Sequence, residues 1–468
     1  MHVKREGEGG LVLKRLRFSG GVLAVVALVA TMVAAAAYGI STKIIGGQLG
    51  EVQCVTQNGS GQTPSGKACS AGGALDSPTA VALMDDGSRI FVAGQNNTVS
   101  IFERDRTSGA LKVLNATPCI TEGGGTVGGL DCGTGRALDG PVAMDSVSNN
   151  TYVVTDGDDS VVTLTREGVG SAWKQRDKSG NCITAGAPPA NCKQGVGITN
   201  PASVTAAGGY VYVGASNSIA IFKPDSNGAL SQSTTAADAC VSSNGSGGSC
   251  ATVPQITGPI VSMGVAKGGA TLYAVDGTSL LQFTRSTTGG LTFKQCYNDT
   301  GSNGCVNVTA PFVNPTSLFV NTSGKSVYVA AHGSNAIAVF GRTLSGANLG
   351  DLNGVALPGG CVSQGGAGGC ISATTLTGVS KVWVHKSNRF AYAIAGDGLA
   401  TFSRNSTTFV LTPLIAPAAC TTETGDGITC KPAFGLAGAS DILGTGTNHY
   451  YVTGQTNSTI AILKVNAT

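Results

Sequence analysis

The chain has 468 residues, of which 70 are glycine, 16 are proline, 14 are cysteine and only 12% are charged. Its 29 basic residues nearly balance its 26 acidic ones, so no field that would attract nucleic acid is expected, and no nucleic-acid partner is predicted. Hydrophobic residues make up 41% of the chain, enough for a sizeable core, which excludes an intrinsically disordered tail.

The first segments of the chain resemble an export signal. Residues 1–19 carry a basic excess and are expected to stay in the cytosol, whereas residues 20–42 are uncharged and long enough, as an apolar helix, to cross a bilayer of about 30 Å. Two alternatives remain open, a signal peptide cleaved near Ala37-Tyr38-Gly39 and an uncleaved signal anchor that keeps the protein at the membrane. Both predict that residues 43–468 are exported, as a secreted or cell-surface protein.

The cysteines reveal an internal repeat. All 14 follow the apolar segment, and the first members of successive close pairs recur every 56 to 65 residues. An even count, export and regular spacing predict seven disulfides rather than a metal or redox site. Each would close a loop of about ten residues and stabilise the fold by about 2–3 kcal/mol. The predicted pairs are Cys54–Cys69, Cys119–Cys132, Cys182–Cys192, Cys240–Cys250, Cys296–Cys305, Cys361–Cys370 and Cys420–Cys430.

Four short strand-like segments lie between successive cysteine pairs. The first repeat reads SPTAVALM, RIFVAG, TVSIFERD and GALKVLNATPC, each segment being rich in Val, Ile and Phe and bounded by turn residues. Four strands in each of seven repeats of about 60 residues predict an all-β, seven-bladed β-propeller with one short disulfide loop per blade. The last repeat stops one strand short, so residues 46–54 are expected to pair beside 460–465 and complete the last blade.

The repeated strands also carry a family resemblance. The segments YVYVGASNSIAIFKPDSNGAL and IFVAGQNNTVSIFERDRTSGAL resemble the lactonase-type, YVTN-like seven-bladed propeller family, and the pattern covers about residues 46–468. The resemblance implies the fold, and it implies function only weakly, because members include sugar-lactone hydrolases and surface proteins of unknown role. The disulfide loops depart from the enzyme pattern, as expected for a disulfide-stapled secreted variant. No catalytic residue of the hydrolases aligns with a position of this chain.

Candidate site residues are sought at the channel mouth, where the innermost strands begin. Catalytic candidates are Asp139, His332 and Asp441. Several carboxylates around one mouth could hold a divalent cation or polarise a lactone carbonyl through a bound water; the metal candidates are Asp76, Asp139, Asp156 and Asp441. The alternative is that Asp and Asn serve as turn residues that cap backbone amides. No other cofactor is indicated, and the disulfide loops are expected to cross the same face, either roofing the mouth or forming a recognition surface.

The glycosylation pattern N-x-[ST] is frequent. In a eukaryotic source these sites predict a glycoprotein, whereas in a bacterial source the pattern reflects only the use of Asn, Ser and Thr as turn residues. The sites are Asn58, Asn96, Asn115, Asn149, Asn244, Asn298, Asn307, Asn321, Asn405, Asn457 and Asn466.

These features favour a non-enzymatic propeller at the cell surface that binds a protein or glycan partner or assembles with itself, and so predict that the chain is not an enzyme. The alternative is a lactone or related ester hydrolase whose site lies at the mouth of the central channel.

Overall fold

The computed structural model describes residues 46–167 and 172–466, all of which belong to one compact unit. The basic segment 1–19 and the apolar segment 20–42 lie outside the described residues. Within the described ranges, no helix is long and apolar enough to cross a membrane.

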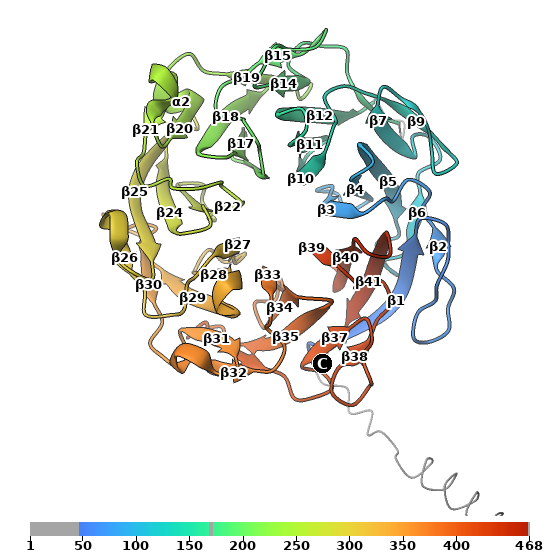
Figure 1. Cartoon of the computed structure of the whole chain (residues 1–468), viewed down its shortest axis with the longest axis vertical. Helices are drawn as coiled ribbons and strands as arrows, with labels where there is room; N and C mark the ends of the chain where they lie inside the picture. Colours follow the sequence, from blue (N-terminus) through green and yellow to red (C-terminus); the bar gives the residue numbers. More distant parts are fainter. Residues whose placement is uncertain (1–45, 168–171, 467–468) are drawn as a thin grey trace, which may run out of the picture. The chain divides into compact units, whose positions relative to one another are not determined.

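Strand pairing divides this part of the chain into seven sheets, each one blade, which are arranged around a central axis (Figure 1). Blade 1 comprises β3 (Pro78–Leu83), β4 (Arg89–Gly94), β5 (Thr98–Arg104), β6 (Leu111–Val113), β7 (Cys119–Glu122), β8 (Gly125–Val127) and β9 (Leu130–Gly135), and blade 2 comprises β10 (Pro141–Val147), β11 (Asn150–Thr155), β12 (Ser160–Arg166), β13 (Trp173–Gln175), β14 (Cys182–Thr184) and β15 (Lys193–Gln194). Blade 3 comprises β16 (Ser203–Ala207), β17 (Tyr210–Gly214), β18 (Ser218–Pro224), β19 (Leu230–Gln232), β20 (Cys240–Ser242) and β21 (Ala251–Thr252). Blade 4 comprises β22 (Ser262–Val265), β23 (Thr271–Val275), β24 (Leu280–Arg285), β25 (Leu291–Asn298) and β26 (Val306–Asn307).

Blades 5 to 7 follow the same order from the centre outward. Blade 5 comprises β27 (Pro315–Val320), β28 (Ser326–Ala331), β29 (Ala336–Arg342), β30 (Leu352–Gly354), β31 (Cys361–Gln364) and β32 (Ile371–Ala373). Blade 6 comprises β33 (Val379–Val384), β34 (Phe390–Ala395), β35 (Gly398–Arg404), β36 (Leu411–Pro413), β37 (Cys420–Thr422) and β38 (Lys431–Pro432). Blade 7 comprises β39 (Ala439–Gly444), β40 (His449–Gly454), β41 (Thr459–Val465), β1 (Leu49–Thr56) and β2 (Ser70–Ala71). Short helical turns are α2 (Ala236–Ala239), η1 (Gly245–Gly248), η2 (Ser302–Gly304), η3 (His332–Ser334) and η4 (Ala367–Gly369). The predicted propeller is confirmed.

The core lies between neighbouring blades, because the middle strands bury both of their faces. Between blades 1 and 2, Phe91 and Ile101 pack with Val153 and Trp173. The rings of Phe91 and Trp173 meet edge to face, with their centroids 4.6 Å apart. Such strands read as nearly continuous apolar runs, which explains why segments such as RIFVAG show little alternation. Each blade is therefore held by its two neighbours in the ring.

The outer part of each blade differs from the predicted four strands. In blade 2 the fourth position is shared by β13 and β14, which both pair with β12, and β15 adds a short parallel strand beyond β14. The physical reason is the disulfide: Cys182 lies in β14 and Cys192 directly precedes β15, so the bridge brings the returning chain alongside the sheet edge.

All seven predicted disulfides are present, at S–S distances between 1.81 and 2.02 Å. Each joins one of the outer strands of a blade to the chain at or just before the short strand beyond it, at the rim of the ring (Figure 1). The alternative in which these loops roof the channel mouth is therefore wrong, because the sheet order places them at the edge opposite the innermost strands. So many disulfides are typical of an extracellular or periplasmic compartment.

Ring closure follows the prediction. β1 pairs antiparallel with β41, with Cys54 opposite Ala461 and Val55 opposite Ile460, so the two ends of the described chain share one blade. This pairing removes the free sheet edge that a linear array of blades would expose.

A recurring contact joins most neighbouring blades, and we call it the tyrosine–arginine clamp. In blade 6, Arg404 donates through Nε to the Tyr328 hydroxyl of blade 5, and its other nitrogens donate to Ser326 Oγ and the Asn388 carbonyl. The Tyr328 hydroxyl donates in turn to the Phe409 carbonyl. The other clamps are Tyr451–Arg104, Tyr212–Arg285 and Tyr273–Arg342. The Tyr and Arg of the family-like motif thus hold the blades together.

Candidate functional site

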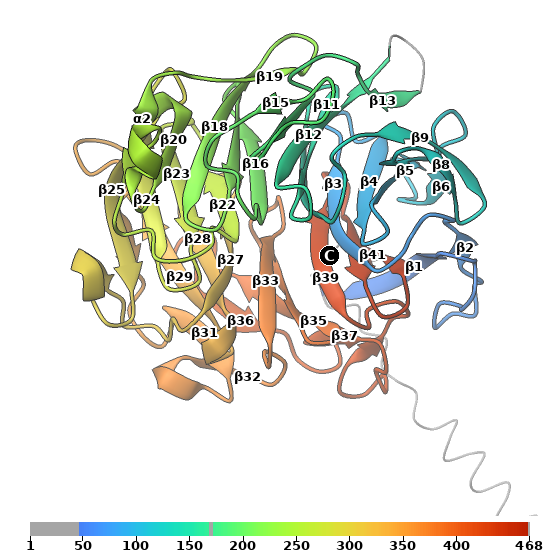
Figure 2. The same cartoon turned by 45° about the horizontal axis from the view of Figure 1, so that its top comes forward.

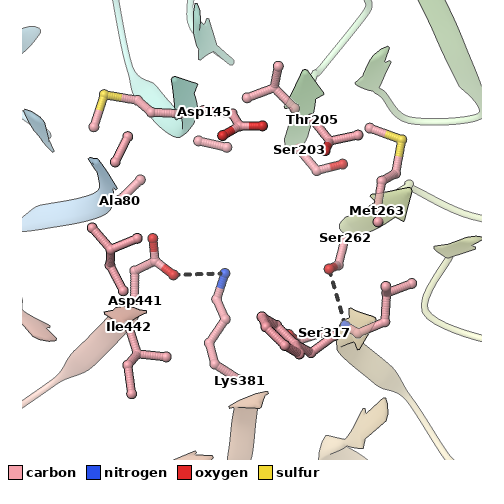
Figure 3. Close-up of a pocket in the computed structure, with 18 of the residues that line it drawn as sticks. Ala80, Asp145, Ser203, Thr205, Ser262, Met263, Ser317, Lys381, Asp441 and Ile442 are labelled. Carbon is pink, nitrogen blue, oxygen red and sulfur yellow. Dashed lines mark hydrogen bonds and ion pairs between the residues drawn. The ribbon is translucent and has the colours of Figure 1, made fainter. Parts of the chain in front are cut away.

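The innermost strands of the blades line a central channel. Its walls are β3, β10, β16, β22, β27, β33 and β39, and its cavity volume is about 410 Å³ (Figure 3). Residues at matching register positions of the seven inner strands lie at the same level along the channel, so its lining is described in layers.

The layer nearer the mouth is rich in hydroxyls. Its members are Ala80, Ala143, Ser203, Ser262, Ser317, Lys381 and Asp441. Lys381 extends into the channel, and its Nζ lies 3.6 Å from Asp441 Oδ1 (Figure 3). The lysine side chain is 36% exposed and that of the aspartate 21%, so both remain accessible to water in the channel.

A second layer lies two residues further along each inner strand. Its members are Ala82, Asp145, Thr205, Gly264, Phe319, Trp383 and Leu443, each paired with a Tyr or Phe of the next strand. Asp145 is the charged member. Its carboxylate accepts hydrogen bonds from the Ser146 and Ala206 amides, both at 2.8 Å.

Burial raises the pKa of the Asp145 carboxyl to about 6, against the opposing effect of its two backbone hydrogen bonds, and the nearby charge of Asp85 adds to the increase. A carboxylate with such a pKa is ionised at neutral pH and is a stronger base than an ordinary aspartate.

Polar side chains also tie the inner strands of adjacent blades together. Asp441 Oδ2 accepts from the Val81 amide at 3.0 Å, in the same way that Asp145 accepts from blade 3. Ser262 Oγ accepts from the Leu318 amide at 3.2 Å. These side chains therefore shape the channel as well as lining it.

The structure places the predicted site residues in two different environments. Asp441 lies in the channel, whereas Asp76, Asp139, Asp156 and His332 are exposed in turns at the ends of strands. Among the described residues, no group of three or more His, Cys, Asp or Glu side chains is close enough to hold a metal ion. Asp139 and Asp156 lie in adjoining turns of blade 2, where the Asp156 amide donates to the Gly140 carbonyl and the Gly157 amide donates to the Asp139 carbonyl. The predicted catalytic and metal sets as a whole are not brought together.

Related turn residues cap the backbone, as the alternative interpretation of the acidic mouth expects. Asp159 accepts from the Asn200 amide of the next blade, and Asp397 accepts from the Gly438 amide of the next blade. Asn97 and Asn335 do the same for Gly140 and Gly378. These side chains use their acceptors to fix one blade against the next.

Two channel residues were missed by the sequence interpretation, Lys381 and Asp145. The available signal was a charge inside an otherwise apolar strand segment, in VSKVWV and PVAMDSV. Which of these charges faces the axis depends on a bulge near the start of the inner strands, for example between Val379 and Lys381.

Two of the predicted glycosylation sites do not fit a glycan in the folded protein. Asn298 and Asn321 are only 4% and 2% exposed, and their side-chain amides donate to Ser302 and Ser323. A glycan needs an exposed, unengaged amide, so modification at these two positions is incompatible with this packing.

Fold and site together define an all-β, disulfide-stapled propeller with a polar central channel. The chain is also similar to several solved structures. They include the periplasmic gluconolactonase of Pseudomonas aeruginosa, at 13% identity and a TM-score of 0.49, with 76% of this chain and 86% of that one covered. A Bacteroides fragilis protein with the provisional description 6-phosphogluconolactonase is similar at 15% identity and a TM-score of 0.48, with 72% of this chain and 82% of that one covered. A Lactobacillus plantarum protein is similar at 14% identity, with a TM-score of 0.47 and coverage of 76% and 86%. No family model and no curated protein matches the chain.

Proposed function

We propose that the protein is a lactone hydrolase whose site is the central channel. The observation that carries this proposal is that the Lys381 ammonium and the Asp145 carboxylate, with a pKa near 6, line the same cavity. Its volume of about 410 Å³ suits a small ligand, and the hydroxyls of the mouth layer suit a polyhydroxylated one such as a sugar lactone.

The chemistry assigns one role to each charged side chain. The Lys381 ammonium polarises the lactone carbonyl and stabilises the negative charge that develops on its oxygen. Asp145 takes a proton from a water molecule, whose oxygen attacks the carbonyl carbon. The ring carbon–oxygen bond then breaks, and the proton passes from Asp145 to the departing alkoxide, which gives the hydroxy acid. Asp441 positions Lys381 through the 3.6 Å ion pair.

Non-catalytic binding of the same class of ligand is the second candidate. It is favoured by the backbone hydrogen bonds that hold Asp145 and Asp441, because a carboxylate fixed between blades also serves to shape a binding surface. In either case the compartment we propose is outside the cytoplasm, with the protein secreted or at the cell surface, because the seven disulfides require an oxidising environment.

The test is the rate of ring opening for five- and six-membered aldonolactones, measured by proton release at pH 6.5 with the spontaneous rate subtracted. We expect Asp145→Asn and Lys381→Met to lower kcat/KM by about 100-fold each, since each removes a group that acts in the transition state. The exposed residues Asp426 and Lys174 provide matched controls, and Asp426→Asn and Lys174→Met should leave the rate unchanged.

Thermal unfolding of each variant separates loss of chemistry from loss of fold. Wild-type protein that binds an aldonolactone in the channel without turning it over would support the second candidate. Absence of both binding and turnover for all lactones tested would contradict the proposal.

A further inference from the structure

The interface between blades 2 and 3 lacks the arginine of the tyrosine–arginine clamp. In blades 1, 4, 5 and 6 the third strand ends in a pattern F-x-R, whose arginine reaches back to the tyrosine of the preceding blade. In blade 3 the same pattern reads Phe222-Lys223-Pro224. Proline has no side-chain donor, so blade 3 offers nothing at this position to the tyrosine of blade 2.

That tyrosine is nevertheless retained. Tyr152 lies in β11, is 0% exposed and packs against Val211 and Phe222 of blade 3, and its hydroxyl has no hydrogen-bond partner. A buried hydroxyl without a partner costs about 1–3 kcal/mol, so such groups are normally satisfied.

A second acceptor at the same place is also unpartnered. Asn150 stands two residues before Tyr152, and its Oδ1 is buried without a hydrogen bond. In two intact clamps the residue at this position accepts from the arginine: Thr271 from Arg342 at 3.1 Å, and Ser326 from Arg404 at 3.0 Å. The interface of blades 2 and 3 thus keeps both side-chain acceptors of the clamp and lacks its donor.

A cavity of about 350 Å³ leads to these two acceptors. Its lining includes Tyr152, Asn150, Gly208 and Asp225, and among the described residues that line it none is a lysine or arginine. The strands that form it, β11 and β17, belong to neighbouring sheets (Figure 1), and the same two sheets, marked by β12 and β18, lie next to one another in Figure 2.

The electrostatic surroundings favour a cation. Burial raises the pKa of the Tyr152 hydroxyl to about 12, against the opposing effect of the adjacent Asn150 side chain, and the charges of Asp145 and Asp225 contribute to the increase. Asp225 holds two turn amides through Oδ1 and carries its negative charge on the exposed side of the cavity.

We propose that this cavity is a binding site for an alkylguanidinium group, and specifically for the arginine side chain of a peptide or protein partner. The incoming guanidinium takes the place of the clamp arginine, donating to the Tyr152 hydroxyl and to Asn150 Oδ1, with Asp225 balancing its charge. A lysine ammonium is a poor substitute, because it lacks the planar set of donors that serves two fixed acceptors at once.

Binding is tested on the full chain, purified under oxidising conditions, by calorimetric titration with Nα-acetyl-L-arginine amide, with methylguanidinium and with Nα-acetyl-L-lysine amide. We expect both guanidinium compounds to bind with a dissociation constant on the order of 1 mM, and the lysine compound at least tenfold more weakly. Binding of methylguanidinium alone would retain the site but assign it to free guanidines. Equal affinity for the lysine and arginine compounds would overturn the proposal, as would no binding of either guanidinium.

Variants locate the site. Tyr152→Phe should weaken binding about tenfold, because one hydrogen bond to a charged group is lost. Tyr450→Phe is the matched control, since Tyr450 is equally buried and its hydroxyl also lacks a partner, yet it does not line this cavity. Pro224→Arg should restore the internal clamp, raise the melting temperature and abolish binding. Unchanged binding in Pro224→Arg would overturn the proposal even if Tyr152→Phe failed to fold.

Discussion

Several charged and polar side chains in this propeller are engaged across blade boundaries. The clamp arginines, the turn residues that cap the next blade, and Asp441 in the channel each bind an atom of an adjacent blade. Removing one partner of such a pair leaves a buried polar group uncompensated, so these residues are expected to be sensitive to substitution.

The half-buried carboxyl of Glu51, in β1, makes the stability of the fold depend on pH. Its Oε2 accepts from the Phe434 amide at 2.9 Å, whereas its Oε1 is buried without a partner. Burial raises the pKa of Glu51 from 4.5 to about 8, and the nearby charge of Glu423 adds to the increase. Because the folded state binds the proton more tightly than the unfolded state, stability falls as the pH rises from about 4.5 through 8.

Glu51→Gln keeps the acceptor for the Phe434 amide and removes the charge. We expect the variant to be more stable than the wild type by about 1–3 kcal/mol at pH 9, and nearly equal to it at pH 5, in urea unfolding at both pH values. Glu122→Gln is the control, because Glu122 also accepts from a backbone amide, that of Leu138, but is exposed. The same pH dependence in wild type and Glu51→Gln would contradict this account.

At the scale of the element, each blade combines an inner three-stranded sheet with a disulfide-stapled edge. The inner strands carry the packing between blades, and the outer strands carry the disulfides. β14 and β15 have only three and two residues, so little besides the bridge holds the returning chain at the edge of blade 2.

The double variant Cys182→Ala/Cys192→Ala should therefore lower the free energy of unfolding by about 2–3 kcal/mol, the value for a loop of about ten residues. It should leave lactone turnover within about twofold of the wild type, because the bridge lies at the rim and the channel is lined by other strands. Urea unfolding and the proton-release assay measure the two effects. The corresponding pair Cys240 and Cys250 of blade 3 provides an independent repeat, and a folded variant that had lost turnover would contradict the separation of rim from channel.

The elements predicted from sequence are those whose signal is local. The disulfide partners are 9 to 15 residues apart, and the closing strand at 46–54 was found because the last repeat lacked one segment. The split fourth strand was missed because both pieces are only a few residues long and pair with the same neighbour.

The clamp and the channel layers were missed for a different reason. The Tyr and Arg of a clamp come from adjacent repeats, such as Tyr328 and Arg404, so each looks like part of a strand motif until the blades are placed side by side. Lys381 and Asp145 face the channel only because of the register of their strands, which no local pattern specifies.

At the scale of the whole molecule, closure of the ring brings the inner strands of all seven blades together around one channel. A single blade contributes a few side chains to the channel, and only the closed ring places Lys381 of blade 6, Asp441 of blade 7 and Asp145 of blade 2 around one cavity (Figure 3). Any activity of the channel therefore depends on the intact ring and on the pairing of β1 with β41.

The most direct test of the channel site is the pH dependence of kcat/KM for aldonolactone hydrolysis by the wild type between pH 4.5 and 7.5. Asp145 acts as a base only when it is ionised, so kcat/KM should rise with pH through an inflection near 6 and level off above 7. A profile that is flat over this range, or one whose only inflection lies near the ordinary aspartate pKa of about 4, would contradict the assignment of Asp145 as the base.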